Sequence, residues 1–309
     1  MRLFHRLAVL TLPLLVAGAA HAAPPGFAFL DIPAGARAAA MGGAYASLAT
    51  GVEAAYWNPA RLTTAHRLEV TAGHSELFAK LRHDYFAVGG GMLGGSAAAS
   101  IRALYSEPID ERDDLGNLVG SFGYHDLELA LGYGAPLGAG LSVGGSAALL
   151  RERISNSAAQ TYSFGAGAAW EPAALPGVRV ALAAQNLGPA ARFSIDTADG
   201  SRTDGAPVGL PAAVQAGVAY ALGVGPRMHF AGALEARAVR GGQGLGMAGA
   251  ELADASGAAL RLGVRVNDTS TAMSFGAGYA LQKFSFDYAF VPLKDDLGDT
   301  HRFGFSARF

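Results

Sequence analysis

The chain has 309 residues, of which 51% are hydrophobic, 16% are charged and 43 are glycine, and it contains no cysteine. The lack of cysteine excludes disulfide scaffolds and thiolate metal sites. The 23 basic and 25 acidic residues nearly balance, so no electrostatic footprint for nucleic acid is present. A mean hydropathy of +0.25 is high for a soluble protein. The composition therefore favours a membrane protein that does not depend on long apolar helices.

The first 22 residues are predicted to be a cleaved export signal. A positively charged start precedes an apolar core over residues 7–19, and Ala20, His21 and Ala22 form a small-x-small cleavage pattern. A short membrane anchor is the alternative, but the apolar stretch is too short to span a bilayer comfortably.

From residue 67 onward, apolar residues recur at every second position, which is the spacing of a strand with two different faces. One example is the alternation of Leu260, Leu262, Val264 and Val266 with Arg261, Gly263, Arg265 and Asn267. A soluble sandwich also alternates. Segments of about ten residues with one apolar face and one small or charged face are typical of an outer-membrane barrel with a polar lumen. On this reading Leu262 faces lipid and Gly263 faces a roomy lumen.

Counting these segments predicts an all-β fold, a transmembrane antiparallel β-barrel of about 14 strands. The starts lie near residues 67, 83, 96, 122, 140, 160, 178, 211, 226, 243, 258, 272, 283 and 300. Connections after even strands are short, whereas two long polar loops are expected at residues 108–119 and 188–209. This asymmetry is that of outer-membrane barrels. It predicts long loops facing outward, both termini in the periplasm, and a location in the bacterial outer membrane.

Between the signal and the barrel, residues 23–66 show little strand alternation and are predicted to be a hatch or plug; residues 67–309 then form the barrel. The stretch 36–48 is expected to form a short Ala-rich helix interrupted at Gly42 and Gly43, and Asn58-Pro59 is a turn signal. A 14-stranded barrel has room for such a segment in its lumen. A periplasmic tail is the alternative.

This segment carries a family resemblance. It reads GARAAAMGGAYASLA and then AAYWNPARL, which resembles the N-terminal hatch of the PorV/PorQ family of FadL-like outer-membrane proteins. The hatch-motif residues are Gly35, Arg37, Met41, Gly42, Gly43, Tyr45, Tyr56, Trp57, Asn58 and Pro59. Residues 287–309 are similar to the last hairpin of that family. Relatives usually carry acidic residues just before the second motif, where this chain has Thr50 and Gly51, with Glu53 slightly later.

The resemblance implies a 14-stranded barrel with an N-terminal plug. PorV-like members bind exported cargo proteins in type IX secretion and pass them to surface attachment, and this role is the favoured one here. The alternative is a FadL-like transporter of long-chain fatty acids or other hydrophobic compounds. A purely structural barrel is a third possibility. Expected partners are outer-membrane lipid and lipopolysaccharide, the barrel-assembly machinery, and either secreted cargo or hydrophobic small molecules, but no nucleic acid.

Charged residues on the predicted lumen face are expected to pair with one another or with the plug, because an unpaired charge in a dry lumen is costly. They are Asp126, Glu128, Glu235, Arg237, Arg261, Arg265 and Asp287, together with Arg179 and Arg302. No fully apolar tunnel is visible in the sequence. Trp57 and Tyr56 are expected to wedge the plug against the barrel wall, with their polar tips finding partners.

Near its end the chain has Phe303, Phe305 and Phe309, which with Ala307 place an apolar residue at every second position. This pattern resembles the C-terminal signal that the barrel-assembly machinery recognises. No enzyme, cofactor or metal site is predicted. A G-x-G-x-x-G match at residues 244–249 lies in a period-two segment without a following helix, and the histidines lack metal-ligand spacing. His74 and His83 flank the first outward connection and are expected to be solvated loop residues.

Overall fold

The computed structural model describes residues 25–196, 201–295 and 297–309. The predicted export signal and the expected position of the N-terminus therefore lie outside the described residues. The helices and strands come from two parts of the sequence. The Gly- and Ala-rich segment up to about residue 65 forms short helices, and the period-two segments after it form strands.

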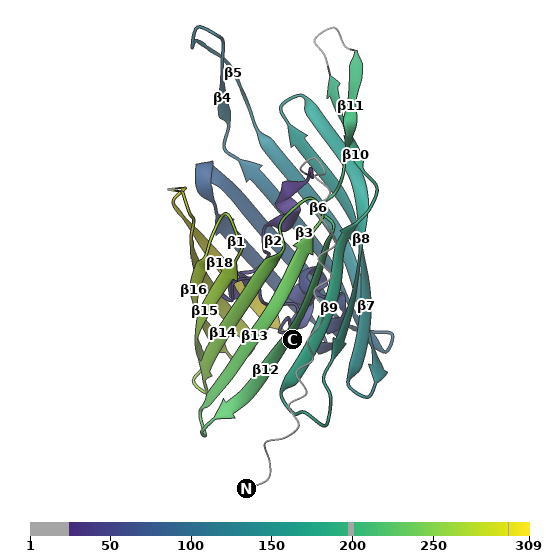
Figure 1. Cartoon of the computed structure of the whole chain (residues 1–309), viewed down its shortest axis with the longest axis vertical. Coiled ribbons are helices and arrows are strands. Elements are labelled where there is room, and N and C mark those ends of the chain that lie inside the picture. Colours follow the sequence, from purple (N-terminus) through teal and green to yellow (C-terminus); the bar gives the residue numbers. More distant parts are fainter. Residues whose placement is uncertain (1–24, 197–200, 296) are drawn as a thin grey trace.

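Fourteen antiparallel strands close into a barrel, which confirms the predicted fold class (Figure 1). The barrel strands are β1 (Glu69–Glu76), β2 (Leu81–Met92), β3 (Gly95–Ser106), β6 (Tyr124–Gly138), β7 (Leu141–Ile154), β8 (Ser157–Trp170), β9 (Val178–Leu187), β12 (Ala213–Val224), β13 (Met228–Val239), β14 (Leu245–Asp254), β15 (Ala258–Val266), β16 (Met273–Leu281), β17 (Phe284–Pro292) and β18 (Asp299–Arg308). Each strand pairs with its neighbour in this order, and β1 pairs with β18 to close the ring.

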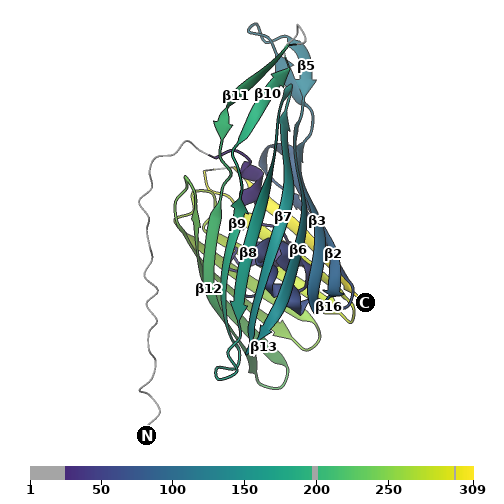
Figure 2. The same cartoon turned by 90° about the vertical axis from the view of Figure 1, so that its right-hand side faces the viewer.

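Two hairpins rise above the barrel where the sequence predicted long polar loops (Figure 2). They are β4 (Ile109–Arg112) with β5 (Leu118–Phe122), and β10 (Ala191–Asp196) with β11 (Arg202–Val208). The strands within these loops were not predicted, because both faces of β4 are exposed. A strand without a buried face has no apolar alternation to detect.

The alternation of the barrel strands separates an apolar outer surface from a polar inner surface. Leu234 is 65% exposed on the outside of β13, whereas its neighbour Glu235 is 5% exposed on the inside. The short helix η4 (Phe78–Lys80) connects β1 to β2. Among the described residues, no helix is long and apolar enough to cross a membrane.

Residues 26–64 lie inside the barrel, and we call them the plug (Figures 1 and 2). Its elements are η1 (Ala28–Asp31), α1 (Ala36–Ala40), η2 (Gly51–Glu53), α2 (Ala54–Trp57) and η3 (Pro59–Thr64). The helix expected over residues 36–48 is therefore shorter than predicted. Gly42 and Gly43 have φ values of 67° and 78°, a left-handed backbone that ends a helix and favours glycine.

The main hydrophobic core forms between the plug and the wall. Plug residues Met41, Tyr45, Leu48, Val52, Trp57 and Leu62 pack there with wall residues Tyr85, Ala87 and Met247. The chain's own N-terminal segment thus occupies part of the lumen, and a cavity borders η1.

Candidate plug and lumen site

The turn at Asn58-Pro59 approaches the wall where three neighbouring strands each present a glycine. Gly134, Gly144 and Gly167 pair with one another across β6, β7 and β8. A Cβ added to Gly144 would lie 2.4 Å from the Pro59 carbonyl carbon, and one at Gly167 would lie 2.0 Å from the Asn58 side-chain oxygen. The plug backbone therefore contacts the wall backbone directly, which only glycine permits.

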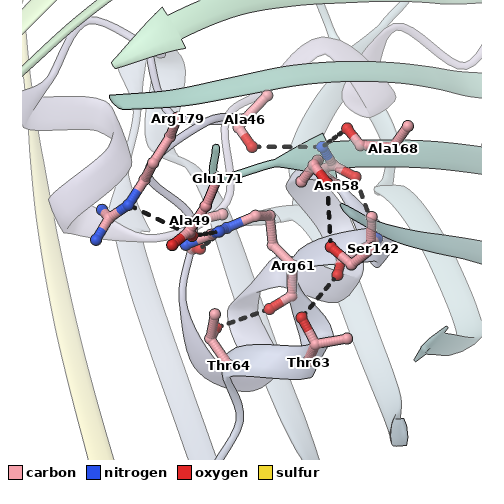
Figure 3. Close-up of polar contacts among 12 residues, drawn as sticks. Ala46, Ala49, Asn58, Arg61, Thr63, Thr64, Ser142, Ala168, Glu171 and Arg179 are labelled. Atoms are coloured by element: carbon pink, nitrogen blue, oxygen red, sulfur yellow. Dashed lines mark hydrogen bonds and ion pairs between the residues drawn. The ribbon is translucent and has the colours of Figure 1, made fainter. Parts of the chain in front are cut away.

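Polar contacts fix this turn in place (Figure 3). The Asn58 side chain accepts a hydrogen bond from the Ala60 amide at 3.1 Å and donates one to the Ala168 carbonyl of β8 at 3.1 Å. Arg61 Nε donates to the Ala49 carbonyl at 3.1 Å, and its guanidinium also pairs with Glu171. The turn is thus bonded to the plug on one side and to the wall on the other.

Arg179 also lies at this end of the plug. Its Nε is 3.5 Å from the Glu171 carboxylate that pairs with Arg61 (Figure 3). Arg179 therefore has an ion-pair partner, as expected for a lumen charge, but this partner, Glu171, was not among the predicted lumen residues.

A second close approach lies on the opposite wall, at Met41 and Gly42. Gly249 and Gly263 pair across β14 and β15, and a Cβ at Gly263 would lie 2.1 Å from the Gly42 amide nitrogen. Gly263 therefore does not face a roomy lumen, and that expectation was wrong. Arg265 Nε donates to the Gly42 carbonyl at 2.8 Å beside this contact.

Arg37 enters a charge network with the wall. Its guanidinium donates to Glu251 through two nitrogens, at 2.8 and 2.7 Å. Glu251 also accepts from Arg261 at 2.5 Å, and Arg261 lies 2.7 Å from Asp287. Two cations and two carboxylates are thereby matched between α1, β14, β15 and β17. Glu251 was not among the predicted site residues, although its alternation with apolar neighbours on β14 would have placed it there.

Glu53 of the plug approaches this network as one further carboxylate. Gly35, with φ at +85°, leaves room for it, since a Cβ at Gly35 would lie 1.5 Å from Glu53 Oε1. Burial, together with the Asp287 carboxylate, raises the pKa of Glu53 to about 7 against the opposing effect of Arg37. Glu53 is thus a plug carboxyl that takes up a proton near neutral pH.

Glu235 binds the plug without a cation. Its carboxylate accepts hydrogen bonds from the amides of Ala46 and Ser47 at 3.1 and 2.8 Å and from the Ser47 hydroxyl at 2.5 Å. Gln215 donates to the same carboxylate at 2.5 Å and to the Gly43 carbonyl at 3.1 Å.

Three wall arginines hold the upper plug segment, residues 30–33. Arg102 donates to the carbonyls of Leu30 and Ile32 and pairs with Glu128 at 2.5 Å; Arg237 pairs with Asp31 at 2.8 Å; Arg302 donates to the Pro33 carbonyl at 3.0 Å. Burial raises the pKa of the Asp31 carboxyl, and the Arg237 and Arg102 guanidinium groups oppose that shift.

The aromatic hatch residues pack mainly on one another. Trp57 contacts Tyr45 and Tyr56 edge-on, at ring centroid distances of 5.7 and 4.9 Å, and its indole N–H donates to the Ala34 carbonyl of the plug at 3.1 Å. Trp57 thus finds its polar partner within the plug, while its ring belongs to the buried cluster that the plug forms with the wall residues Tyr85 and Met247. Tyr56 also reaches a wall side chain, with the Arg102 guanidinium 4.7 Å from its ring.

Asp126 departs from the expected pairing. It faces the lumen and is buried beside Tyr124 and its cross-strand neighbour Glu152, and no basic side chain lies within ion-pair distance among the described residues. The expectation of a charge partner is wrong for Asp126. A carboxyl can take up a proton instead, which removes the cost of burying its charge.

The two histidines also differ from expectation. His74 lies on the outer face of β1, 2.6 Å from Asp84, and His83 is buried inside the barrel. Neither is a solvated loop residue. In the described part of the chain, no group of three or more histidine or acidic side chains could hold a metal ion. The predicted assembly residues Phe303 and Phe309 are exposed on the outside, while Phe305 stacks between Phe284 and Phe286.

A cavity of about 890 Å³ lies beside and above the plug. Its apolar lining includes Phe29 and Trp57 of the plug and Leu104, Val239 and Met247 of the wall; its polar lining includes Arg237, Arg265 and Arg302. The sequence showed no such space because plug side chains, which carry no strand alternation, line it together with wall and loop residues that are far apart in the sequence. A mostly apolar cavity with a few convergent polar groups is the usual form of a small-molecule site.

No family model and no curated protein matches this chain. Its fold is similar to that of the Pseudomonas putida toluene transporter TodX, with a TM-score of 0.61, 13% identity, and coverage of 89% of this chain and 98% of TodX. The Ralstonia pickettii toluene transporter TbuX gives a TM-score of 0.60 at 13% identity, covering 89% and 98%. A Pseudomonas aeruginosa FadL homologue gives 0.53 at 12% identity, covering 88% and 97%. At these identities the likeness is one of fold.

Proposed function

We propose that this chain is an outer-membrane barrel that admits small hydrophobic molecules through its plugged lumen. The observation that carries this proposal is the mostly apolar cavity of about 890 Å³ between plug and wall. Such a space holds an apolar molecule out of water, and its few polar groups orient it. The toluene transporters with the same fold support transport rather than catalysis, and transport of hydrophobic compounds rather than secretion.

The proposed location is the bacterial outer membrane. The apolar outer surface of the strands suits a lipid environment, and the polar lumen suits a closed barrel that spans it. We place the hairpins β4–β5 and β10–β11 on the outside of the cell, with lipopolysaccharide and the barrel-assembly machinery as expected partners. The short turns at the other end then face the periplasm.

Protein secretion of the PorV/PorQ type is the second candidate. One observation favours it: the β4–β5 hairpin stands above the barrel and exposes Leu115, Leu118 and Val119 at 87%, 61% and 60%. Exposed apolar side chains on a projecting hairpin are a feature of protein-binding surfaces. A pull-down of the solubilised protein, with and without residues 109–122, would show whether exported proteins bind there.

Uptake measurements test the transport proposal. Cells that express the protein should take up dilute radiolabelled toluene faster than cells without it. Val239→Trp fills part of the cavity and should return uptake towards the background rate. Val266→Trp adds the same ring on the outer face of β15, where Val266 is 62% exposed, and should leave uptake unchanged. The proposal would be overturned if cells with wild type, with either variant and without the protein all took up toluene at the same rate.

A further inference from the structure

Apart from the exposed Arg240, which also lines the cavity, four wall arginines face the cavity or the plug segment that borders it, and three of them have a carboxylate partner. These pairs are Arg102 with Glu128 at 2.5 Å, Arg237 with Asp31 at 2.8 Å and Arg265 with Asp268 at 2.9 Å. The fourth is Arg302, which has no carboxylate within ion-pair distance in the described part of the chain.

The Arg302 guanidinium is nevertheless buried. Only 7% of the residue is exposed, one nitrogen donates to the Pro33 carbonyl at 3.0 Å, and Nε is buried without a hydrogen-bond partner among the described residues. Arginine does not lose its proton in proteins. A buried permanent charge therefore requires a counter-charge. The buried Asp126 differs in this respect, because a carboxyl, unlike a guanidinium, can become neutral.

Two further polar side chains lie beside Arg302 at the same level of the wall. Ser75 on β1 is the cross-strand neighbour of both Arg302 on β18 and His83 on β2. Ser75 and His83 are 6% and 2% exposed, and Nε2 of His83 has no hydrogen-bond partner in the described residues. The next guanidinium, that of Arg265, adds positive potential. Arg302 and Arg265 line the cavity, and Ser75 and His83 lie next to Arg302 in the sheet.

We propose that Arg302, Ser75 and His83 form an anion-binding site at the wall of the cavity. The site takes a small monoanionic group, supplied either by a free inorganic anion or by an acidic hydrophobic molecule whose apolar part occupies the cavity. The second source rests on the proposed function. It separates this chain from a channel for neutral hydrocarbons only, since a neutral molecule leaves Arg302 without a counter-charge.

Calorimetry on the full chain in detergent tests the site with four probes: 4-butylbenzoate, its neutral counterpart butylbenzene, chloride and inorganic phosphate. Wild type should bind 4-butylbenzoate, and Arg302→Met should weaken this binding at least tenfold, by a much larger factor than any change in the affinity for butylbenzene. Arg302→Lys, which keeps the charge, should retain part of the affinity. Arg308→Met is the matched control: Arg308 lies on the same strand, 3.7 Å from Glu69 and away from the cavity, and its loss should change neither affinity.

The outcomes separate the sources and the proposals. If chloride or phosphate binds wild type and is lost in Arg302→Met, a free anion occupies the site; if only 4-butylbenzoate does so, the anion belongs to the ligand. Equal binding of every anion to wild type and to Arg302→Met, with heat-modifiable migration showing both folded, would overturn the site. Butylbenzene binding would persist in that case and would leave the transport proposal standing.

Discussion

Glu235 on β13 holds Ser47 of the plug through two hydrogen bonds, one to the backbone amide at 2.8 Å and one to the hydroxyl at 2.5 Å. The carboxylate is buried, and its partners are hydrogen-bond donors rather than a cation. Bonds to an ionised acceptor are stronger than those between neutral groups. This contact is therefore a major attachment between the plug and the wall.

Replacing Glu235 by alanine should loosen the plug. The change leaves two amides and a hydroxyl without their acceptor, and an unsatisfied buried donor costs about 1–3 kcal/mol. We expect plug docking to weaken by roughly 2–5 kcal/mol in total, and single-channel conductance in planar bilayers to rise. Glu111→Ala, on exposed β4, is the control and should conduct like wild type. Unchanged conductance in Glu235→Ala would show that other contacts suffice.

Gly144→Val should displace the Asn58-Pro59 turn. The added side chain meets the Pro59 backbone at 2.4 Å, and overpacking of this kind costs about 1–3 kcal/mol. Limited proteolysis should then cut the plug faster while the barrel remains heat-modifiable. The control is Gly145→Val, one residue on, whose Cβ would have one neighbour at an ordinary 3.7 Å. Equal cleavage rates for the two variants would contradict direct contact between the backbones.

The Glu53 carboxyl should make stability depend on pH. Its pKa is about 7 in the folded plug and 4.5 as an ordinary glutamate. The folded state therefore keeps a proton between pH 4.5 and 7 that the unfolded state releases, so the contribution of Glu53 is fully present below pH 4.5 and is lost as pH rises through 7. The charged and titratable groups that face Glu53 are Arg37, Tyr45, Tyr85, Arg261 and Asp287.

Glu53→Gln isolates this effect from the other titrating groups. Urea unfolding of wild type and variant at several pH values should give a difference in unfolding free energy that changes between pH 4.5 and 7 and stays constant above that range. Glu111→Gln on exposed β4 should show no such change. A difference that is independent of pH would mean that Glu53 is ionised throughout.

Deleting Phe309 should impair barrel closure. The Phe309 amide donates to the Leu68 carbonyl at 2.8 Å, and the Leu68 amide donates back at 3.4 Å, so the last residue extends the β1–β18 seam. Losing this end and its exposed ring should lower the amount of heat-modifiable protein in the outer membrane. Phe309→Tyr keeps ring and backbone and should assemble normally. Normal assembly of the deletion variant would count against an assembly signal at this position.

The barrel was predictable because the alternation of side chains between its two faces depends only on residues that are adjacent in the sequence. Alternation along each strand, as in residues 260–267, directly reports which side chains face lipid, and the lumen charges Glu235, Arg237 and Arg261 follow from it. The hairpins β4–β5 and β10–β11 were not predicted within their loops; β4, for example, is exposed on both faces and carries no such pattern. Strand boundaries also shifted by a few residues, as with β2, which begins at Leu81 rather than near residue 83.

The site was less predictable because it depends on contacts between distant segments. The glycines at 134, 144 and 167 look like ordinary small lumen residues, and only the folded plug shows that each makes room for Asn58-Pro59. The lack of a partner for Asp126 and Arg302 is likewise a property of three-dimensional neighbours. Charge counting along the chain cannot show which carboxylate reaches which arginine.

Arginine substitutions at Leu262 and Gly263 should therefore have two different effects, the first on barrel stability and the second on plug position. Leu262 lies on the outer face of β15, 41% exposed, and arginine there should lower the stability of the barrel in lipid by about 2–4 kcal/mol if it lies near the bilayer midplane. Arginine at Gly263 meets the Gly42 backbone at 2.1 Å. It should displace Met41 and Gly42 of the plug from β15 and raise the single-channel conductance, while the outer surface of the barrel stays intact. Folding into lipid vesicles, followed by urea unfolding, measures the first effect, and planar-bilayer recording measures the second.

A Leu262→Arg variant as stable as wild type would place that side chain away from lipid. A Gly263→Arg variant that folds and conducts like wild type would mean that the lumen at β15 has room for a long side chain, as the sequence alone predicts.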